Sequence, residues 1–316
     1  MASFHTVLLS RRHWMWGAAG MCSGGLARAS EPQVVASFSI LADMARELAP
    51  TGVRVASLVG PDADAHVYKP TPTDARRLSQ ARMVLVNGLG FEGWMDRLIR
   101  VSGHAGAPVV ASRGMEPRRS GAHQSGLGSH SHGHKHSHSE VDPHAWHHPG
   151  HARRYVDNIS QALTERWPQH SQEIAARQSD YVLRMNALEG QLRARLSQVP
   201  RDQRRVLVSH DAFGYLGEAF GIDFLAPQGW TTASEPSAAA VGRLIRQVRE
   251  QRVRALFVEN ISDPRLVERI AQESGARVGG VLYSDALSHP GGRADTYLRL
   301  LEHNLVTLTD TLRATR

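Results

Sequence analysis

The stretch VVASFSILADMAREL, residues 34–48, determines the fold class of this 316-residue chain. Val34 to Phe38 form an apolar run typical of a buried strand, and Ile40 to Leu48 have the apolar spacing of a helix. A second β-branched run, Val53 to Val59, follows. Strand, helix and strand in this order predict a βαβ unit. The chain is therefore expected to be an α/β protein with mainly parallel sheets and functional loops at the carboxyl ends of the strands.

The alternation of strands and helices continues along both halves of the chain. Further strands are predicted at Arg82–Val86, Val109–Ala111, Arg205–Ser209, Ala212–Phe220, Ala255–Glu259 and Arg277–Leu282. Further helices are predicted at Ala239–Gln251, Arg265–Glu273 and Ala294–Leu312. Asn87 is followed by Gly88-Leu89-Gly90, which we interpret as a tight turn from strand to helix because the remaining glycines and the lysine of a phosphate loop are missing.

A long helix is predicted between the two halves, from Pro168 to Gln198, where proline is absent after the first residue and apolar residues recur at helical spacing. At a rise of 1.5 Å per residue it would extend about 45 Å, enough to run along two lobes and join them. Two helices broken near Gly190 are the alternative. We expect a signal peptide at 1–29, an N-terminal lobe at 30–165, a rigid linking helix at 166–199 and a C-terminal lobe at 200–316.

The N-terminus has the three parts of an export signal. Arg11-Arg12 precede a mildly apolar segment, residues 14–26, and Ala27-Arg28-Ala29 is a small-x-small cleavage pattern. Cleavage is expected after Ala29, which places the mature protein in the periplasm. The twin-arginine route and an ordinary secretory signal both fit this segment.

The bulk composition of the chain indicates an ordinary globular protein. Hydrophobic residues make up 41% and charged residues 21%, and the apolar runs stay shorter than the ~20 residues of a membrane helix. Loss of three arginines with residues 1–29 lowers the formal charge from +7 to +4, and the remaining arginines are scattered. Nucleic-acid binding is therefore not expected. The single cysteine, Cys22, lies in the signal, so a disulfide is also excluded from the mature chain. The bulky Met21 before it disfavours a lipid anchor there.

A His-rich segment, residues 116–140, interrupts the alternation and is predicted to be a mobile surface loop because it offers almost nothing to bury. Its histidines are His123, His130, His132, His134, His136 and His138. Two interpretations remain open, namely zinc collection and a solubilising tract that binds metals weakly.

Four side chains are candidate metal ligands: His66, His144, His210 and Asp285. Each follows a predicted strand or lies in a loop bounded by proline or glycine, where side chains from different strands can meet between two lobes. Imidazole and carboxylate are ligands that zinc accepts, and four of them close a tetrahedron and leave no position for a reacting water. This set therefore favours carriage of a metal over catalysis.

Motifs along the chain resemble those of the metal-binding solute-binding proteins of ABC importers, the cluster A-I or ZnuA-like family. They are Val34–Phe38, Asn87–Glu92 and Tyr283–Ser288. The resemblance implies two α/β lobes joined by a rigid helix, with the metal held in the cleft by His66, His144, His210 and Asp285. It implies a carrier, not an enzyme, that captures Zn(II) and delivers it to an ABC permease in the inner membrane. We expect a monomer, with a zinc chaperone as a further partner.

The third ligand position favours zinc. In this family manganese binders carry Glu where zinc binders carry His, and this chain has His210; imidazole in place of a carboxylate also favours Zn²⁺ over Mn²⁺ on chemical grounds. A manganese or iron carrier of the same fold is the first alternative. A zinc hydrolase, with Asp285 as a base and water on the metal, is the second. The segment His147-His148-Pro149 departs from the family pattern, and its two histidines are interpreted as incidental or as supports of the site.

Overall fold

Two four-stranded parallel sheets form the framework of the computed structural model, which describes residue 1 and residues 32–119, 141–226 and 237–314. The first sheet has the order β2-β1-β3-β4 and consists of β1 (Val34–Phe38), β2 (Val55–Val59), β3 (Met83–Val86) and β4 (Val109–Val110). The second has the order β6-β5-β7-β8 and consists of β5 (Arg205–Leu207), β6 (Asp223–Leu225), β7 (Ala255–Glu259) and β8 (Arg277–Leu282). We name the first sheet with its helices the N-terminal lobe and the second the C-terminal lobe. The predicted α/β class is confirmed.

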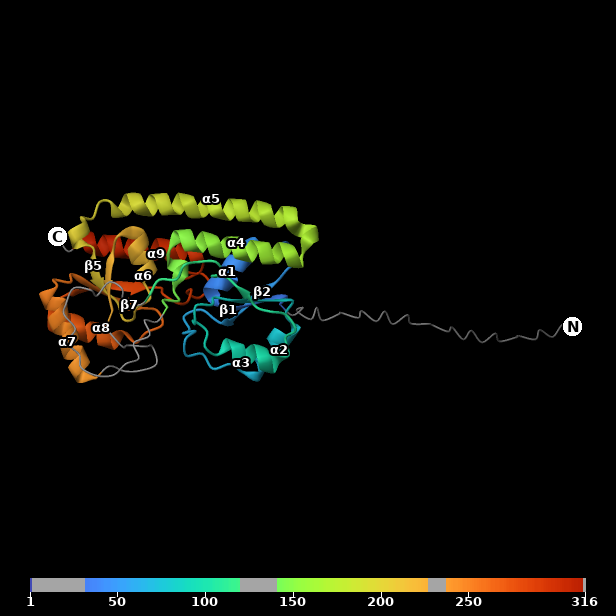
Figure 1. Cartoon of the computed structure of the whole chain (residues 1–316), viewed down its shortest axis with the longest axis horizontal. Helices are drawn as coiled ribbons and strands as arrows, with labels where there is room; N and C mark the ends of the chain where they lie inside the picture. Colours follow the sequence, from blue (N-terminus) through green and yellow to red (C-terminus); the bar gives the residue numbers. More distant parts are fainter. Residues whose placement is uncertain (2–31, 120–140, 227–236, 315–316) are drawn as a thin grey trace. The chain divides into compact units, whose positions relative to one another are not determined.

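Helices connect the strands of each sheet (Figure 1). The N-terminal lobe contains α1 (Ser39–Leu48), α2 (Pro72–Gln80), α3 (Met95–Ser102) and α4 (Pro149–Arg166). The C-terminal lobe contains α6 (Gly214–Phe220), α7 (Ala238–Glu250), α8 (Pro264–Ser274) and α9 (Tyr297–Ala314). Short 3₁₀ turns are η1 (Ala145–His147), η2 (Pro168–His170) and η3 (Arg201–Gln203).

Local sequence explains where several helices begin and end. Thr71 and Asp74 form a capping box at the start of α2, with a proline at the first helical position. Asp263 caps α8 by accepting from the backbone N–H of Arg265, and Gly275 ends the helix in the left-handed conformation. The turn after β3 also has the predicted form: Gly88, Leu89 and Gly90 all have positive φ angles.

The central strands carry the most apolar sequence. All five residues of β1 and all five of β7 are buried, because helices cover both faces of each parallel sheet. The largest buried cluster draws side chains from both lobes, including Phe38, Trp146, Phe213 and Leu301. The described elements belong to one compact unit, Glu31–Arg316. Within the described ranges we find no helix both long and apolar enough to cross a bilayer.

A single unbroken helix, α5 (Ser171–Leu196), joins the lobes and packs against α4 and α9 (Figure 1). Its 26 residues correspond to about 39 Å. Arg184 pairs with Glu47 of α1 at 2.5 Å, whereas Arg195 pairs with Asp310 of α9 at 2.5 Å. The helix is therefore fastened to both lobes, and the alternative of a break at Gly190 is wrong.

The predicted strand at Ala212–Phe220 is wrong, because residues 214–220 form helix α6. The buried residues Tyr215, Leu216, Ala219 and Phe220 recur at helical spacing, and Gly221 ends the helix with φ 66°. β5 and β6 are parallel neighbours, so the chain must cross over between them, and α6 makes that crossover.

Some predictions fall on residues outside the described ranges. These are the signal segment with Cys22, its cleavage after Ala29, and all six histidines of the His-rich segment. Only residues 116–119 of that segment are described, and Arg119 forms an isolated antiparallel bridge with Val141, the residue that follows the segment.

Candidate metal centre

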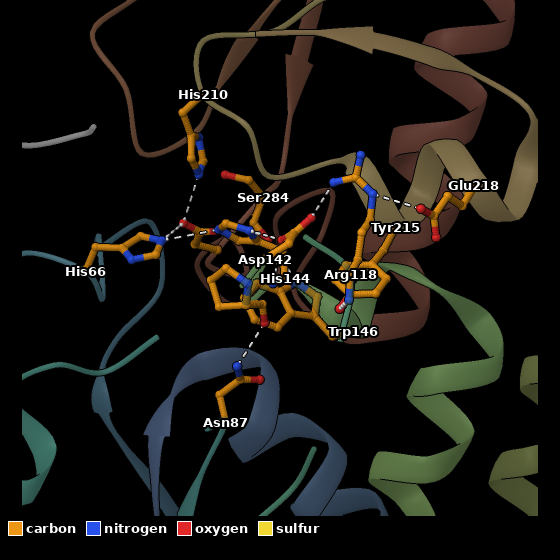
Figure 2. A network of polar contacts seen from close by, with 12 residues as sticks. His66, Asn87, Arg118, Asp142, His144, Trp146, His210, Tyr215, Glu218 and Ser284 are labelled. Carbon is orange, nitrogen blue, oxygen red and sulfur yellow. Dashed lines mark hydrogen bonds and ion pairs between the residues drawn. The ribbon is translucent and has the colours of Figure 1, made fainter. Parts of the chain in front are cut away.

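The four predicted ligands lie together in the structure, and Figure 2 shows His66, His144 and His210 from this group. His66 lies in the loop after β2, and His144 directly precedes η1, so both come from the N-terminal lobe. His210 follows β5 and Asp285 follows β8, so both come from the C-terminal lobe. One donor atom from each side chain lies within 4.8 Å of the donor atoms of the other three. Among the described residues, this is the only group of three or more such side chains that could hold a metal ion.

The Nε2 atoms of the three imidazoles surround the carboxylate of Asp285. Oδ2 of Asp285 lies 3.2 Å from Nε2 of His66 and 3.4 Å from Nε2 of His210, and Oδ1 lies 3.5 Å from Nε2 of His144. The Nε2 atoms of His66 and His144 are 3.3 Å apart. The side chain of Asp285 is fully buried, and that of His66 is 26% exposed. The cluster therefore meets solvent mainly on the His66 side.

Two buried carboxylates hold the imidazoles of His144 and His210 from behind. Oδ1 of Asp142 accepts from the backbone N–H of His144 at 3.0 Å and lies 2.8 Å from Nδ1 of the same ring. Glu259, the last residue of β7, accepts from the backbone N–H of His210 at 2.8 Å, and its other oxygen lies 2.5 Å from Nδ1 of His210. With Nδ1 facing a carboxylate, each ring directs Nε2 toward the cluster. This is the arrangement that orients histidine ligands around metals.

Burial and nearby charges shift the pKa values of the cluster in opposite directions. Burial alone would lower the pKa of His210, but the charges of Glu259 and Asp285 outweigh it and raise this pKa well above the usual range. Burial likewise opposes protonation of His66, yet the hydrogen bond with Asp285 and its charge raise the His66 pKa. Burial would raise the pKa of Asp285, but the charges of His144 and His210 hold it well below the ordinary value. The cluster is thus an ionised carboxylate that attracts protons to the imidazoles of His66 and His210.

Hydrogen bonds within the N-terminal lobe and between the lobes fix the loops that carry the ligands. Trp146, two residues after His144, donates Nε1–H to the backbone oxygen of Ser284, next to Asp285, at 3.1 Å. Asn87 donates to the backbone oxygen of Pro143 at 2.9 Å, and its own oxygen accepts from Tyr155. The loops of His144 and Asp285 therefore support each other.

The two extra histidines beside the site have other surroundings and lie outside the cluster. His147 is fully buried between Trp146 and Phe213, with ring centroids 5.5 and 5.0 Å away, and burial lowers its pKa to about 4. His148 is the N-cap of α4 and accepts from the backbone N–H of Gly150.

Sequence reasoning missed the supporting residues Asp142, Glu259 and Arg118. A signal was present for two of them: Asp142 stands two residues before His144, and Glu259 is an acidic residue at the end of the apolar strand ALFVE. Arg118 gives no such signal, because its role depends on contacts with residues far away in sequence.

Comparison with known proteins identifies the family. The family described as "Zinc-uptake complex component A periplasmic" (ZnuA) matches residues 34–311. The iron-binding protein YfeA of Yersinia pestis is 31% identical over 87% of this chain and 85% of its own length. The manganese-binding lipoprotein MntA of Halalkalibacterium halodurans is 28% identical over 89% and 88%. The solved structure of the periplasmic zinc-binding protein TroA from Treponema pallidum superposes with a TM-score of 0.78 at 26% identity, covering 89% of this chain and 99% of that one. The resemblance drawn from the motifs is confirmed: the chain belongs to the ZnuA family of metal-binding, extracytoplasmic substrate-binding components of ABC transporters, which are transport proteins and not enzymes.

Proposed function

We propose that this protein captures Zn(II) in the periplasm and delivers it to an ABC permease of the inner membrane. In this proposal Nε2 of His66, His144 and His210 and the carboxylate of Asp285 ligate the ion, which is the transported cargo. Two ligands come from each lobe, so binding one ion would hold the two lobes together.

The spacing of the donor atoms is the observation that carries this proposal. Zinc bound to nitrogen or oxygen at about 2.0–2.1 Å in a tetrahedron requires its ligand atoms to lie about 3.3–3.4 Å apart. Four separations in the cluster, which involve both oxygens of Asp285, are 3.2, 3.3, 3.4 and 3.5 Å, and one donor atom from each of the four side chains lies within 4.8 Å of the others. These distances support a tetrahedral zinc shell formed by the four side chains.

The chemistry of the donors favours zinc over manganese. Three imidazoles and one carboxylate suit Zn²⁺, whereas Mn²⁺ prefers more oxygen ligands in an octahedral shell. Iron is the second candidate cargo, since imidazole also suits iron and an iron-binding relative is 31% identical. The hydrolase alternative is dropped because the family consists of transport proteins.

Metal analysis of a matched pair of variants tests the ligand assignment. The purified mature protein is expected to retain one Zn²⁺ after dialysis, and His210→Ala is expected to lose it with every histidine of the His-rich segment still present. His147→Leu removes an imidazole beside the site that is not a proposed ligand and should retain the ion. Equal retention by the His210 variant would refute the assignment. Titration with Zn²⁺, Mn²⁺ and Fe²⁺ in competition identifies the cargo.

The proposal also includes export of the protein and the boundaries of its lobes. A signal peptide at 1–29 is removed, and the lobes and linking helix have the boundaries 30–165, 166–199 and 200–316. N-terminal sequencing of periplasmic protein should begin at Ser30. A lipid-modified Cys22 at the N-terminus would instead indicate a membrane-anchored protein.

We further propose that the mature protein is a monomer loaded in part by a zinc chaperone. Size-exclusion chromatography with light scattering tests the first statement, and zinc transfer from a candidate chaperone tests the second.

A further inference from the structure

Arg118 connects the two lobes beside the metal cluster (Figure 2). Its guanidinium is only 7% exposed. Nη1 donates to Oδ2 of Asp142 in the N-terminal lobe at 2.9 Å, and Nε donates to Oε1 of Glu218 on α6 in the C-terminal lobe at 2.9 Å. The backbone N–H of Arg118 donates to the hydroxyl of Tyr215, also on α6, at 2.7 Å. Arg118 thus contacts Asp142 in the N-terminal lobe and two residues of α6 in the C-terminal lobe.

The first residue of α6 leaves room for this guanidinium. A Cβ atom at Gly214 would lie 2.0 Å from Nη1 and 2.4 Å from Cζ of Arg118, and 2.9 Å from Oδ2 of Asp142. Real carbon atoms cannot approach so closely, so any side chain at position 214 must displace Arg118. The absence of a side chain therefore permits the contact of Arg118 with both lobes.

The contact continues to a proposed ligand. Asp142 uses Oδ2 for Arg118 and Oδ1 for His144, and its side chain is fully buried. A buried carboxylate needs a charged or hydrogen-bonding partner on each oxygen to keep one orientation. Glu218, Arg118, Asp142 and His144 therefore form one chain of contacts from α6 to the metal cluster.

We propose that Arg118 is a positioning residue for the metal site: it joins α6 of the C-terminal lobe to Asp142 and so fixes the ring of His144 in the orientation that ligation requires. This inference rests on the proposed function. Arginine suits this role because its planar group presents separate N–H donors to two carboxylates at once, whereas lysine is a compact point charge.

Zinc affinity of matched variants, measured by competition with a chelator, tests the inference. Loss of a supporting partner typically weakens metal binding by about 10–100-fold, and Arg118 acts one contact further away, so Arg118→Gln should weaken binding about tenfold. Gly214→Ala changes no charge but displaces the guanidinium and should have a similar effect. Arg118→Lys should restore part of the loss. Because both substitutions break the same contact, the double variant should be no more than about twofold weaker than Arg118→Gln alone.

Two control variants separate positioning from general destabilisation. Arg195→Gln breaks the ion pair with Asp310 between α5 and α9, away from the cluster, and Gly190→Ala adds a methyl group where nothing lies within 4 Å. Both should bind zinc within about twofold of the parent. The absorption spectrum of the Co²⁺ form should change in Arg118→Gln and stay unchanged in Arg195→Gln, even where the two lower the melting temperature equally.

The outcomes distinguish this inference from the proposed function. If the parent protein retains zinc but Arg118→Gln and Gly214→Ala bind it within about twofold of the parent, the positioning role is wrong and the function stands. An equal loss in Arg195→Gln would also overturn it. Should Arg118→Gln fail to fold, Gly214→Ala and Arg118→Lys decide the question. A parent protein that retains no zinc would overturn the proposed function itself.

Discussion

Zinc binding should weaken steeply as the pH falls, and the decline should begin above the ordinary pKa of histidine. The pKa values of His66 and His210 are both raised above 6.5, so protons already compete for these rings near neutral pH. A metal ligand must be deprotonated, and each proton that must leave weakens binding by up to about tenfold, or about 1.4 kcal/mol, per pH unit below its pKa. Asp285 adds no such dependence in this range, because its pKa lies well below 3.8.

The size of the fall in zinc affinity follows from the raised pKa values of His66 and His210. At pH 6.5 both rings are more than half protonated in the metal-free protein, so zinc binding should release more than one proton in total. Between pH 7.5 and 6.5 the affinity should fall by more than the roughly threefold expected for two unperturbed histidines. Calorimetry in two buffers of different ionisation enthalpy counts the protons, and chelator competition measures the affinity.

Glu259→Gln provides the internal control for this prediction. The charge of Glu259 is the main cause of the raised pKa of His210 apart from the opposing effect of burial. Its removal should flatten the pH dependence between pH 7.5 and 6.5. It should also weaken binding at pH 8.5 by about 10–100-fold, because His210 loses its support. A parent protein that releases fewer than about one proton per zinc at pH 6.5, or an affinity that changes less than about threefold over this unit, would refute the reasoning.

Three further predictions address the surroundings of the site. His147→Leu should bind zinc within about twofold of the parent at pH 7.5. The variant should also resist acid better. In the folded parent the pKa of His147 is about 4, below the unfolded value near 6.5, so the unfolding free energy of the parent falls by up to roughly 3 kcal/mol between pH 6.5 and 4, whereas the variant avoids this loss. Denaturant unfolding of the metal-free forms measures the difference. Deletion of residues 120–140 should leave one zinc bound within about threefold of the parent affinity, and loss of the ion after dialysis would contradict the four-ligand assignment. Gly88→Ala places a side chain at φ 84° with its Cβ 2.6 Å from Cγ1 of Val110, and should lower the unfolding free energy by about 1–3 kcal/mol in denaturant titration, with an unchanged midpoint counting against this account.

The sequence was sufficient for the framework because its signals are local. The buried run at Val34–Phe38 and the helical spacing of residues 40–48 each depend on neighbours a few positions away, and the structure has β1 and α1 there. The strand predicted at Ala212–Phe220 failed for a related reason. Short apolar runs fit either state, and only the parallel pairing of β5 with β6 requires a crossover at that point.

Part of the candidate site was predictable because three of its residues follow strands, which are themselves recognised from local sequence. His66, His210 and Asp285 follow strands, and the carboxyl ends of parallel strands meet at one edge of a sheet. His144 does not follow a strand in the structure, and the motif around it was needed to include it. Acidic residues such as Glu259 stand out in the sequence, but the partner of each support could not be assigned, because Arg118 is 100 residues from Glu218 and His210 is 49 from Glu259. No periodicity connects positions so far apart.

The charges around the cluster explain why a site that attracts protons would also attract a divalent cation. Three buried carboxylates, Asp285, Asp142 and Glu259, and the buried guanidinium of Arg118 lie at the cluster. Counted over these four described groups, with neutral imidazoles and apart from the partly exposed Glu218, two negative charges are uncompensated. Uncompensated charge is costly in a buried site. One Zn²⁺ would neutralise it, and in the metal-free state protons on His66 and His210 reduce it, which is the physical origin of their raised pKa values. Capture of the ion is therefore an exchange of cations, and a more acidic medium favours release by supplying the competing protons.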